Sequence, residues 1–305
     1  MAFTAADVKN LREMTGVGMM DCKKALAEAD GDMDKAVEIL REKGLAASQK
    51  KAGRIAAEGM AYAAVIDGVG VVVEVNAETD FVAKNDKFVD FVKGVAATVA
   101  ANKPADLDAL MACKYAGTDK TVLEQQQEMV LVIGENIKVR RFAFYTEGVS
   151  VPYIHAGGKI GVLVNLETNL TAEQVNEAGK DAAMQIAALN PRFWDKSQVT
   201  QDVLDEEKKI MLVQMENDPK MASKPEKVKE NIVMGKLNKF YSENCLLQQE
   251  FVKDNTTTVE KYLAAAAKAL GGTITFKDAV RFEKGEGIEK KQENFAEEIA
   301  KQLAK

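Results

Sequence analysis

The sequence has few of the residues on which catalytic and metal sites usually depend. Among its 305 residues there is one histidine, His155, and there are three cysteines, Cys22, Cys113 and Cys245. A lone histidine could act as a general base, but no nucleophile accompanies it in sequence. Cysteines this far apart have no metal-ligand spacing. A Gly-rich loop ending in Gly-Lys-Ser or Gly-Lys-Thr is also absent, which excludes the usual phosphate-binding loop. We therefore expect no catalytic site, no metal and no bound cofactor.

The chain also lacks a basic excess and a long apolar run. Its net charge of −6 argues against nucleic acid as the main partner, because phosphate binding needs a basic face. No apolar run approaches the roughly 20 residues of a membrane helix. The N-terminus has no basic segment before an apolar one, as a secretory signal would. Three cysteines cannot all pair internally, which favours a reducing compartment. The expectation is a cytoplasmic protein that binds neither membranes nor nucleic acid directly.

The composition is that of a globular protein, with 47% hydrophobic and 29% charged residues, and the length suggests two or three domains. Residues 1–45 have the caps and stops of three short helices, with a cap at Thr4, a stop at Gly16 and a final stop at Gly44. A small helical bundle is predicted there. Residues 46–57 carry lysine and arginine among alanines and are predicted to be a basic, helical linker.

Two valine-rich runs, Gly70–Val75 and Gly161–Leu166, indicate a faint internal repeat. Each follows a short strand and a glycine-containing turn, precedes a helix, and is followed later by a further strand. A hairpin followed by helices favours an antiparallel sheet. The predicted fold class is therefore α+β, with two related core units whose sheets are mainly antiparallel. The first unit would span residues 58–146, and the second would span 147–196 and 243–285.

The second unit is interrupted by residues 197–242, which have the composition of long helices. A break at Asn217–Pro219 predicts two antiparallel helices, and such a hairpin cannot bury much apolar surface by itself. The hairpin is either an interaction arm or a pair of helices that folds back on its own core, and both interpretations stay open. Residues 286–305 would form a C-terminal module with a helix from Asn294 to Leu303.

The segment Glu78–Lys84 is the most informative part of the chain. It directly follows the first valine-rich run and places an acid, Asp80, beside a large aromatic, Phe81. One interpretation is that Phe81 closes the core beneath the strand end, as a buried phenylalanine would. The other is that Phe81 fills a pocket of a partner, as the residues that dominate interface energies do.

Two segments, Leu11–Leu26 and Glu74–Lys84, resemble the two signature segments of the bacterial elongation factor Ts family. The resemblance covers essentially the whole chain, including Ile133–Arg141, the region of His155 and Arg281–Lys290. Two long motifs in the right order are far more specific than one short pattern. The resemblance implies a guanine-nucleotide exchange factor, not an enzyme. Such a factor binds elongation factor Tu carrying GDP, dislodges Mg²⁺ and promotes GDP release so that GTP can bind.

The resemblance also implies structural features and residue roles. The N-terminal bundle would be ubiquitin-associated-like, and the 197–242 hairpin would be a coiled coil that could form a homodimer. The segment linked to loss of Mg²⁺ from the partner corresponds to Thr79, Asp80, Phe81 and Val82. Contacts with the partner are implied for Arg12, Met19, Met20, Ile133, Gly134 and His155. One of the two methionines could instead belong to the core of the bundle, and His155 could be an ordinary surface or turn histidine.

Two other functions stay open from the residues alone. A small helical domain fused to an adaptor could be a general module that recognises peptides or acidic tails. An enzyme could use His155 as its base. A pull-down from bacterial lysate would separate an exchange factor from an adaptor, because an exchange factor retains one abundant GTPase and loses it when nucleotide and Mg²⁺ are added. Replacing His155 would test the enzyme.

Overall fold

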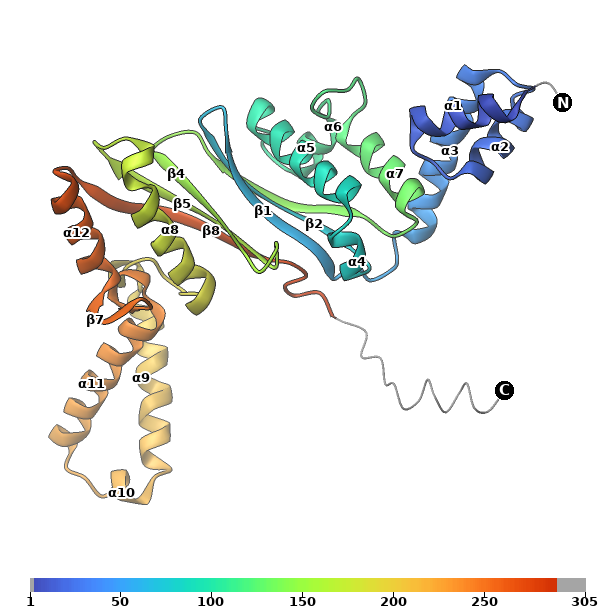
Figure 1. The fold of residues 1–305 in the computed structure, drawn as a ribbon. Helices are drawn as coiled ribbons and strands as arrows, with labels where there is room; N and C mark the ends of the chain where they lie inside the picture. The colour runs from blue at the N-terminus through green and yellow to red at the C-terminus, as the bar shows by residue number, and fades with distance from the viewer. Residues whose placement is uncertain (1–2, 290–305) are drawn as a thin grey trace. The chain divides into compact units, whose positions relative to one another are not determined.

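A computed structural model describes residues 3–289 of the chain (Figure 1). It contains two compact units. Unit 1 comprises the chain up to Phe144, residues Ile154–Gly161 and the described residues from Phe282 onward, and unit 2 comprises Tyr145–Tyr153 and Val162–Arg281. The helix predicted from Asn294 to Leu303 lies outside the described residues. The finer domain boundaries drawn from the sequence stay predictions.

Unit 1 begins with the helices α1 (Ala5–Thr15), α2 (Met19–Glu28) and α3 (Met33–Lys51). A capping box between Thr4 and Asp7 starts α1, and Gly16 ends it in the left-handed conformation with φ of 67°. Asp32 caps α3 by accepting hydrogen bonds from two backbone amides. The helices share a core of buried side chains that includes Val8, Leu11, Leu26, Ala36 and Leu40. Caps and apolar spacing in the sequence therefore account for the start and the packing of these helices.

The third helix is longer than the sequence predicts. A stop was expected at Gly44, but α3 continues through this residue as one helix to Lys51, so that prediction is wrong. Gly44 is not among the glycines with positive φ, and nothing in its backbone ends the helix. The first part of the predicted 46–57 linker is therefore the last part of α3.

The sheet of unit 1 has the strand order β1–β2–β3, where β1 is Glu58–Ile66, β2 is Val69–Ala77 and β3 is Lys138–Tyr145. Strands β1 and β2 form an antiparallel hairpin in which Glu58 pairs with Ala77. Asp67 and Gly68 make its turn, both with positive φ of 49° and 81°, which matches the twist of the flanking strands. Every residue of β2 is buried, because β2 is the central strand.

Helices follow β2 and pack on this sheet. They are α4 (Asp80–Ala83), α5 (Asp86–Asn102), α6 (Leu107–Ala112) and α7 (Val122–Ile133). Helix α5 contacts β1 and β2, and its buried stripe includes Phe88, Phe91, Val92, Val95 and Val99, the helical spacing of an amphipathic helix. Helix α7 has a capping box at Thr121 and ends at Gly134 with φ of 87°. The ends of β2 and α7 lead into the two loops that form the candidate site.

The second sheet has the order β4–β5–β8, where β4 is Val149–His155, β5 is Ile160–Thr168 and β8 is Ile274–Glu283. Between β5 and β8 the chain forms α8 (Ala172–Leu189), η1 (Lys196–Gln198), the helices of the hairpin, η2 (Leu246–Gln248), β6 (Glu250–Phe251), β7 (Asp254–Thr258) and α12 (Val259–Leu270). The chain thus runs strand, strand, helices, strand through each sheet, in the predicted order. The predicted α+β fold class is confirmed.

The hairpin of unit 2 consists of α9 (Gln201–Glu216), the short α10 (Pro219–Ala222) and α11 (Glu226–Asn244) (Figure 1). These helices occupy the segment in which the sequence predicts two helices with a break at Asn217–Pro219. Helices α9 and α11 contact each other through the buried side chains Met211, Met215, Val233 and Leu237. Other large apolar side chains of the same helices are exposed, namely Ile210, Leu212, Val213, Val228 and Met234. The hairpin therefore buries one apolar stripe and leaves several other apolar side chains exposed.

Candidate functional site

Phe81 lies on α4, a single helical turn that begins directly after β2. Its side chain is 81% exposed, whereas that of the neighbouring Val82 is 8% exposed and packs in the core of unit 1. Thr79 caps the turn, because its hydroxyl accepts a hydrogen bond from the Val82 amide at 3.4 Å. The structure excludes the interpretation that Phe81 closes the core, since Val82 takes that position.

Two glutamates join the loop before α4 to the loop after α7, and we call this pair of residues the Glu78–Glu135 clasp. The Glu135 carboxylate accepts hydrogen bonds from the amides of Glu78 and Thr79, at 3.1 and 3.0 Å, and from the Thr79 hydroxyl at 2.7 Å. In return, the Glu78 carboxylate accepts the Asn136 amide at 2.6 Å. Arg54 lies 3.5 Å from the Glu78 carboxylate. Hydrogen bonds to ionised acceptors are stronger than neutral ones, so the clasp holds the base of α4 in place.

Asp80 is the first residue of α4 and points outward beside Phe81. Its carboxylate forms an ion pair with Lys84, whose ammonium lies 3.5 Å away, and both side chains are more than half exposed. Exposed ion pairs one helical turn apart contribute little to stability. Asp80 can therefore exchange Lys84 for another cation or hydrogen-bond donor at small cost.

A cleft of about 380 Å³ lies between α4 and the turn that joins α1 to α2. It is lined by Arg12, Gly16, Val17, Gly18, Phe81, Val82, Asn85, Lys87, Val132 and Ile133. Four of the residues predicted for the site, Arg12, Phe81, Val82 and Ile133, thus meet at one place. The lining includes two cationic side chains and no carboxylate. The Lys87 ammonium donates to the Gly16 carbonyl at 3.3 Å, which ties the start of α5 to the helical bundle.

The remaining predicted residues surround this cleft or lie apart from it. Met19 and Met20 begin α2 directly after Gly18 and are 42% and 62% exposed, so neither belongs to the core of the bundle. Gly134 is the exposed cap of α7, next to Ile133. His155 is exposed at the end of β4 and does not line the cleft.

A buried glutamate on β2 joins three of the segments that carry the family resemblance. The Glu74 side chain is fully buried, and its carboxylate accepts hydrogen bonds from Arg140, Arg141 and the Gly285 amide. Gly285 has φ of +70°, and a Cβ there would lie 2.1 Å from the Ala57 carbonyl oxygen, so only glycine fits. This network supports the strand that leads into α4.

Within residues 3–289, no group of three or more histidine, cysteine or acidic side chains is arranged to hold a metal ion. No helix in the same range is long and apolar enough to cross a membrane. The candidate site centres on the exposed Phe81, on a turn held by the Glu78–Glu135 clasp, and this geometry suits contact with another molecule.

Comparison with known proteins matches the chain to a family. The family described as Elongation factor TS matches residues 78–286. The chain is 50% identical over 305 residues to elongation factor Ts of Clostridium kluyveri, covering 98% of both chains. It is 48% identical over 303 residues to elongation factor Ts of Syntrophotalea carbinolica, covering 98% of this chain and 99% of that one. The chain belongs to the elongation factor Ts family. The resemblance given by Leu11–Leu26 and Glu74–Lys84 is confirmed at the level of the family.

Several residues that shape the site of this elongation factor Ts family member are not evident from the sequence. The sequence assigns no role to the side chains of Glu78, Glu135 and Lys87, although Glu135 directly follows Ile133–Gly134. The partners within the clasp are 56 to 58 residues apart in the chain. The only sign of the clasp in the sequence is an acidic residue in each of two family segments. It does not indicate from which amides the carboxylates accept hydrogen bonds.

Replacing Glu135 by glutamine should loosen the loop before α4. The side-chain NH₂ group of glutamine, which replaces one carboxylate oxygen, is a hydrogen-bond donor. It would face the donor groups of Glu78 and Thr79, so about 1–2 kcal/mol of local stability should be lost. We expect the amides of Glu78 and Thr79 to exchange with deuterium roughly 5- to 30-fold faster, since local opening sets the exchange rate. Glu38→Gln, at an exposed position of α3, is the control. Unchanged exchange in Glu135→Gln would show that the clasp does not hold the loop.

Proposed function

We propose that this protein is the guanine-nucleotide exchange factor of elongation factor Tu, and that it acts in the cytoplasm without a reaction centre of its own. Membership of the elongation factor Ts family supports the proposal. The observation that carries it is Phe81, an aromatic side chain that is 81% exposed on a turn held by the Glu78–Glu135 clasp. An aromatic anchor that is already ordered before binding loses little conformational entropy in the complex.

In this proposal, Phe81 inserts into the packed region behind the nucleotide site of the partner. Asp80 makes a polar contact beside it, while Thr79 and Val82 hold the turn in position. The insertion disturbs the groups that bind Mg²⁺ and the phosphates, so that Mg²⁺ leaves and GDP follows. Because the two binding equilibria are linked, an exchange protein that binds the nucleotide-free partner more tightly than the nucleotide-bound partner must weaken nucleotide binding by the same ratio.

The other predicted contacts extend this surface. Arg12, Met19 and Met20 would touch the nucleotide domain of the partner, and methionine suits a contact that must form and then release. Ile133 and Gly134 would contact the same domain beside Phe81. His155 would reach a different domain. These contacts would need no nucleic acid and no membrane.

The test is the release of fluorescent GDP from elongation factor Tu, measured by stopped flow with and without this protein at several Mg²⁺ concentrations. Acceleration is expected at millimolar Mg²⁺. The acceleration should be smaller when a chelator has already removed Mg²⁺, because the loss of Mg²⁺ that the exchange factor promotes is then complete. Equal acceleration with and without Mg²⁺ would exclude the Mg²⁺ step, and no acceleration at all would exclude exchange activity.

We further propose that the α9–α11 hairpin carries a homodimer contact. Its exposed apolar side chains, which include Val213 and Met234, are of the kind that a second copy covers. Replacing residues 205–236 by a short Gly-Ser linker keeps the buried contacts of Val199, Phe240 and Cys245 at the base of the hairpin. This deletion should abolish self-association in sedimentation and leave GDP release within about twofold of the parent, because α4 is in unit 1. A deleted form that sediments like the parent but no longer stimulates release would make the hairpin a partner contact.

A further inference from the structure

Helix α3 belongs to two hydrophobic clusters at once. Ala36 and Leu40, in its first half, are buried in the core of the bundle. Ala47, beyond Gly44, packs against the core that lies under the unit 1 sheet. Helix α7 is shared in the same way, because Val130 is buried in the sheet core while Leu131 packs against the bundle. Two helices that each contribute to both clusters join the bundle to the sheet without a free linker.

Gly44 faces the backbone of α7 in this contact. A Cβ built on Gly44 would lie 3.4 Å from the backbone oxygen of Gln127 and 3.6 Å from its carbonyl carbon, so α3 meets the backbone of α7 here. Glycine inside a helix is less favourable than alanine, and its φ is not one that requires glycine. The space beside Gly44 therefore admits a methyl group in ordinary van der Waals contact, whereas a larger side chain would meet the backbone of α7.

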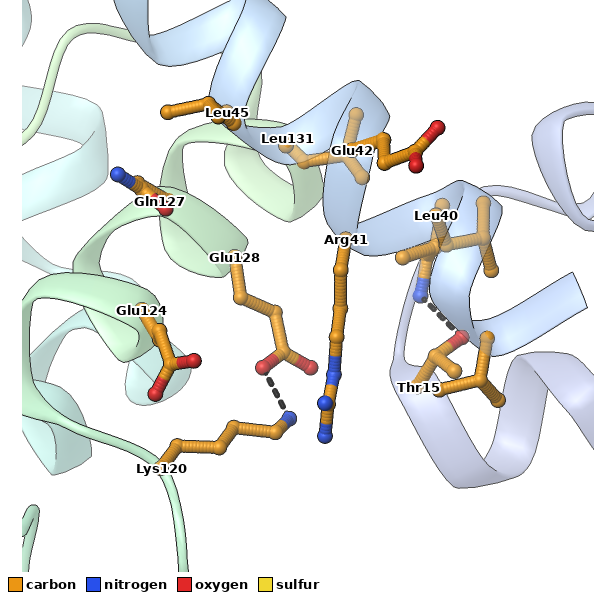
Figure 2. Close-up of a pocket in the computed structure, with 13 residues that line it drawn as sticks. Thr15, Leu40, Arg41, Glu42, Leu45, Lys120, Glu124, Gln127, Glu128 and Leu131 are labelled. Carbon is orange, nitrogen blue, oxygen red and sulfur yellow. Dashed lines mark hydrogen bonds and ion pairs between the residues drawn. The ribbon is translucent and has the colours of Figure 1, made fainter. Parts of the chain in front are cut away.

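Side chains from both helices surround this contact and leave a pocket of about 250 Å³ beside it. Figure 2 shows the pocket between α3, which contributes Leu40, Arg41 and Leu45, and α7, which contributes Glu124, Gln127 and Glu128. An ion pair between Lys120 and Glu128 closes one edge. The bundle has a second tether at the hydrogen bond from Lys87 to the Gly16 carbonyl. The two contacts involve different parts of the bundle, α3 and the α1–α2 turn.

We propose that the contact of α3 with α7 at Gly44 positions the bundle, so that Arg12 and Met19–Met20 are held at a fixed place relative to Phe81. The bundle and the α4 turn then meet the partner as one surface instead of as two parts ordered on binding. The inference rests on the proposed function for its consequence, but the docking itself is a property of the free protein. Loss of the docking should weaken the binding of elongation factor Tu. The release of GDP that Phe81 promotes should keep its usual rate once the complex has formed.

The test compares Gly44→Leu with Gly44→Ala and with Gly235→Leu. Gly235 lies on α11, and a Cβ there meets nothing within 4 Å, so this variant controls for the change from glycine to leucine in a helix. Spin labels at Lys23 and Lys93, in a Cys113→Ser background, report the distance between α2 and α5. We expect one narrow distance in the parent, in Gly44→Ala and in Gly235→Leu, and a broadened or shifted distribution in Gly44→Leu.

GDP release gives the functional half of the test. Gly44→Leu should raise the KM for the complex of elongation factor Tu with GDP about tenfold, or about 1.4 kcal/mol, and should leave kcat within about twofold. A second variant, Glu42→Gly with Ala46→Gly, softens α3 at two exposed positions and should show the same pattern even if leucine unfolds the bundle. A broadened distance with an unchanged KM, or a raised KM with an unchanged distance, overturns the proposal. Failure of the parent itself to accelerate GDP release would instead reject the proposed function, and the distances would still test the docking.

Discussion

Phe81→Ala is expected to slow the stimulated release of GDP roughly 30- to 700-fold while the protein stays as stable as the parent. The first effect follows from the loss of an aromatic anchor, which costs about 2–4 kcal/mol at an interface hot spot. The second follows from exposure, because a side chain that is 81% exposed leaves no cavity when it is truncated. Stopped-flow release of fluorescent GDP measures the first effect, and thermal unfolding measures the second.

Two further variants make the result specific to Phe81. Unlike Phe81→Ala, Val82→Ala should lower Tm by several degrees, since Val82 is buried in the core of unit 1. Leu123→Ala removes another large exposed side chain, 44% exposed on α7, and should change neither quantity. If Phe81→Ala itself lowers Tm as a core substitution does, the ring supports the fold and is not an anchor.

Glu74→Ala is expected to destabilise the protein by about 3 kcal/mol, the largest stability effect that the structure predicts for a single polar side chain. The substitution removes the acceptor of Arg140 Nη1, Arg141 Nε and the Gly285 amide, although both arginines keep hydrogen bonds to Glu286. Breaking a buried ion pair from one side costs about 3–5 kcal/mol. We expect the lower end of this range, because the two arginines are about a quarter to a third exposed and can reach water. Urea unfolding measures the loss, with Glu38→Ala as the control.

The same carboxylate should make stability depend on pH in the acid range. Burial opposes the charged form of Glu74, but the hydrogen bonds from Gly285, Asn76 and the two arginines outweigh it and hold its pKa below the usual value of 4.5. A pKa that is lower in the folded state means that the unfolded chain binds the proton more tightly. The contribution is therefore complete above about pH 4.5 and is lost as the pH falls through the lower, folded-state pKa.

This pH dependence has its own test. Glu74→Gln cannot ionise, so its unfolding free energy should change less than that of the parent between about pH 5 and pH 3. The difference in unfolding free energy between the parent and Glu74→Gln should become smaller as the pH falls. Parallel curves over this range would show that Glu74 does not contribute to acid unfolding.

The local features of this protein were evident from its sequence. The valine-rich run of β2 marks a buried strand, the cap at Thr4 and the left-handed Gly16 delimit α1, and the break at Asn217–Pro219 separates α9 from α11. Each of these signals acts through neighbouring residues: the hydrophobic pattern of the strand, the caps of the helix, and the amide hydrogen that proline lacks. Two long segments in order also sufficed to indicate the family. Such information lies within a few residues of the position that it describes.

Only the tertiary structure decided which of two adjacent side chains faces the solvent and how the site is held. Phe81 and Val82 are both apolar, and a turn of four residues is too short for a periodic pattern to assign one of them to the core. The Glu78–Glu135 clasp joins loops more than 50 residues apart, and Gly44 lies inside α3 at a point where the backbone of α7 passes beside it. These outcomes depend on contacts between distant segments, which neither propensity nor spacing along the chain encodes.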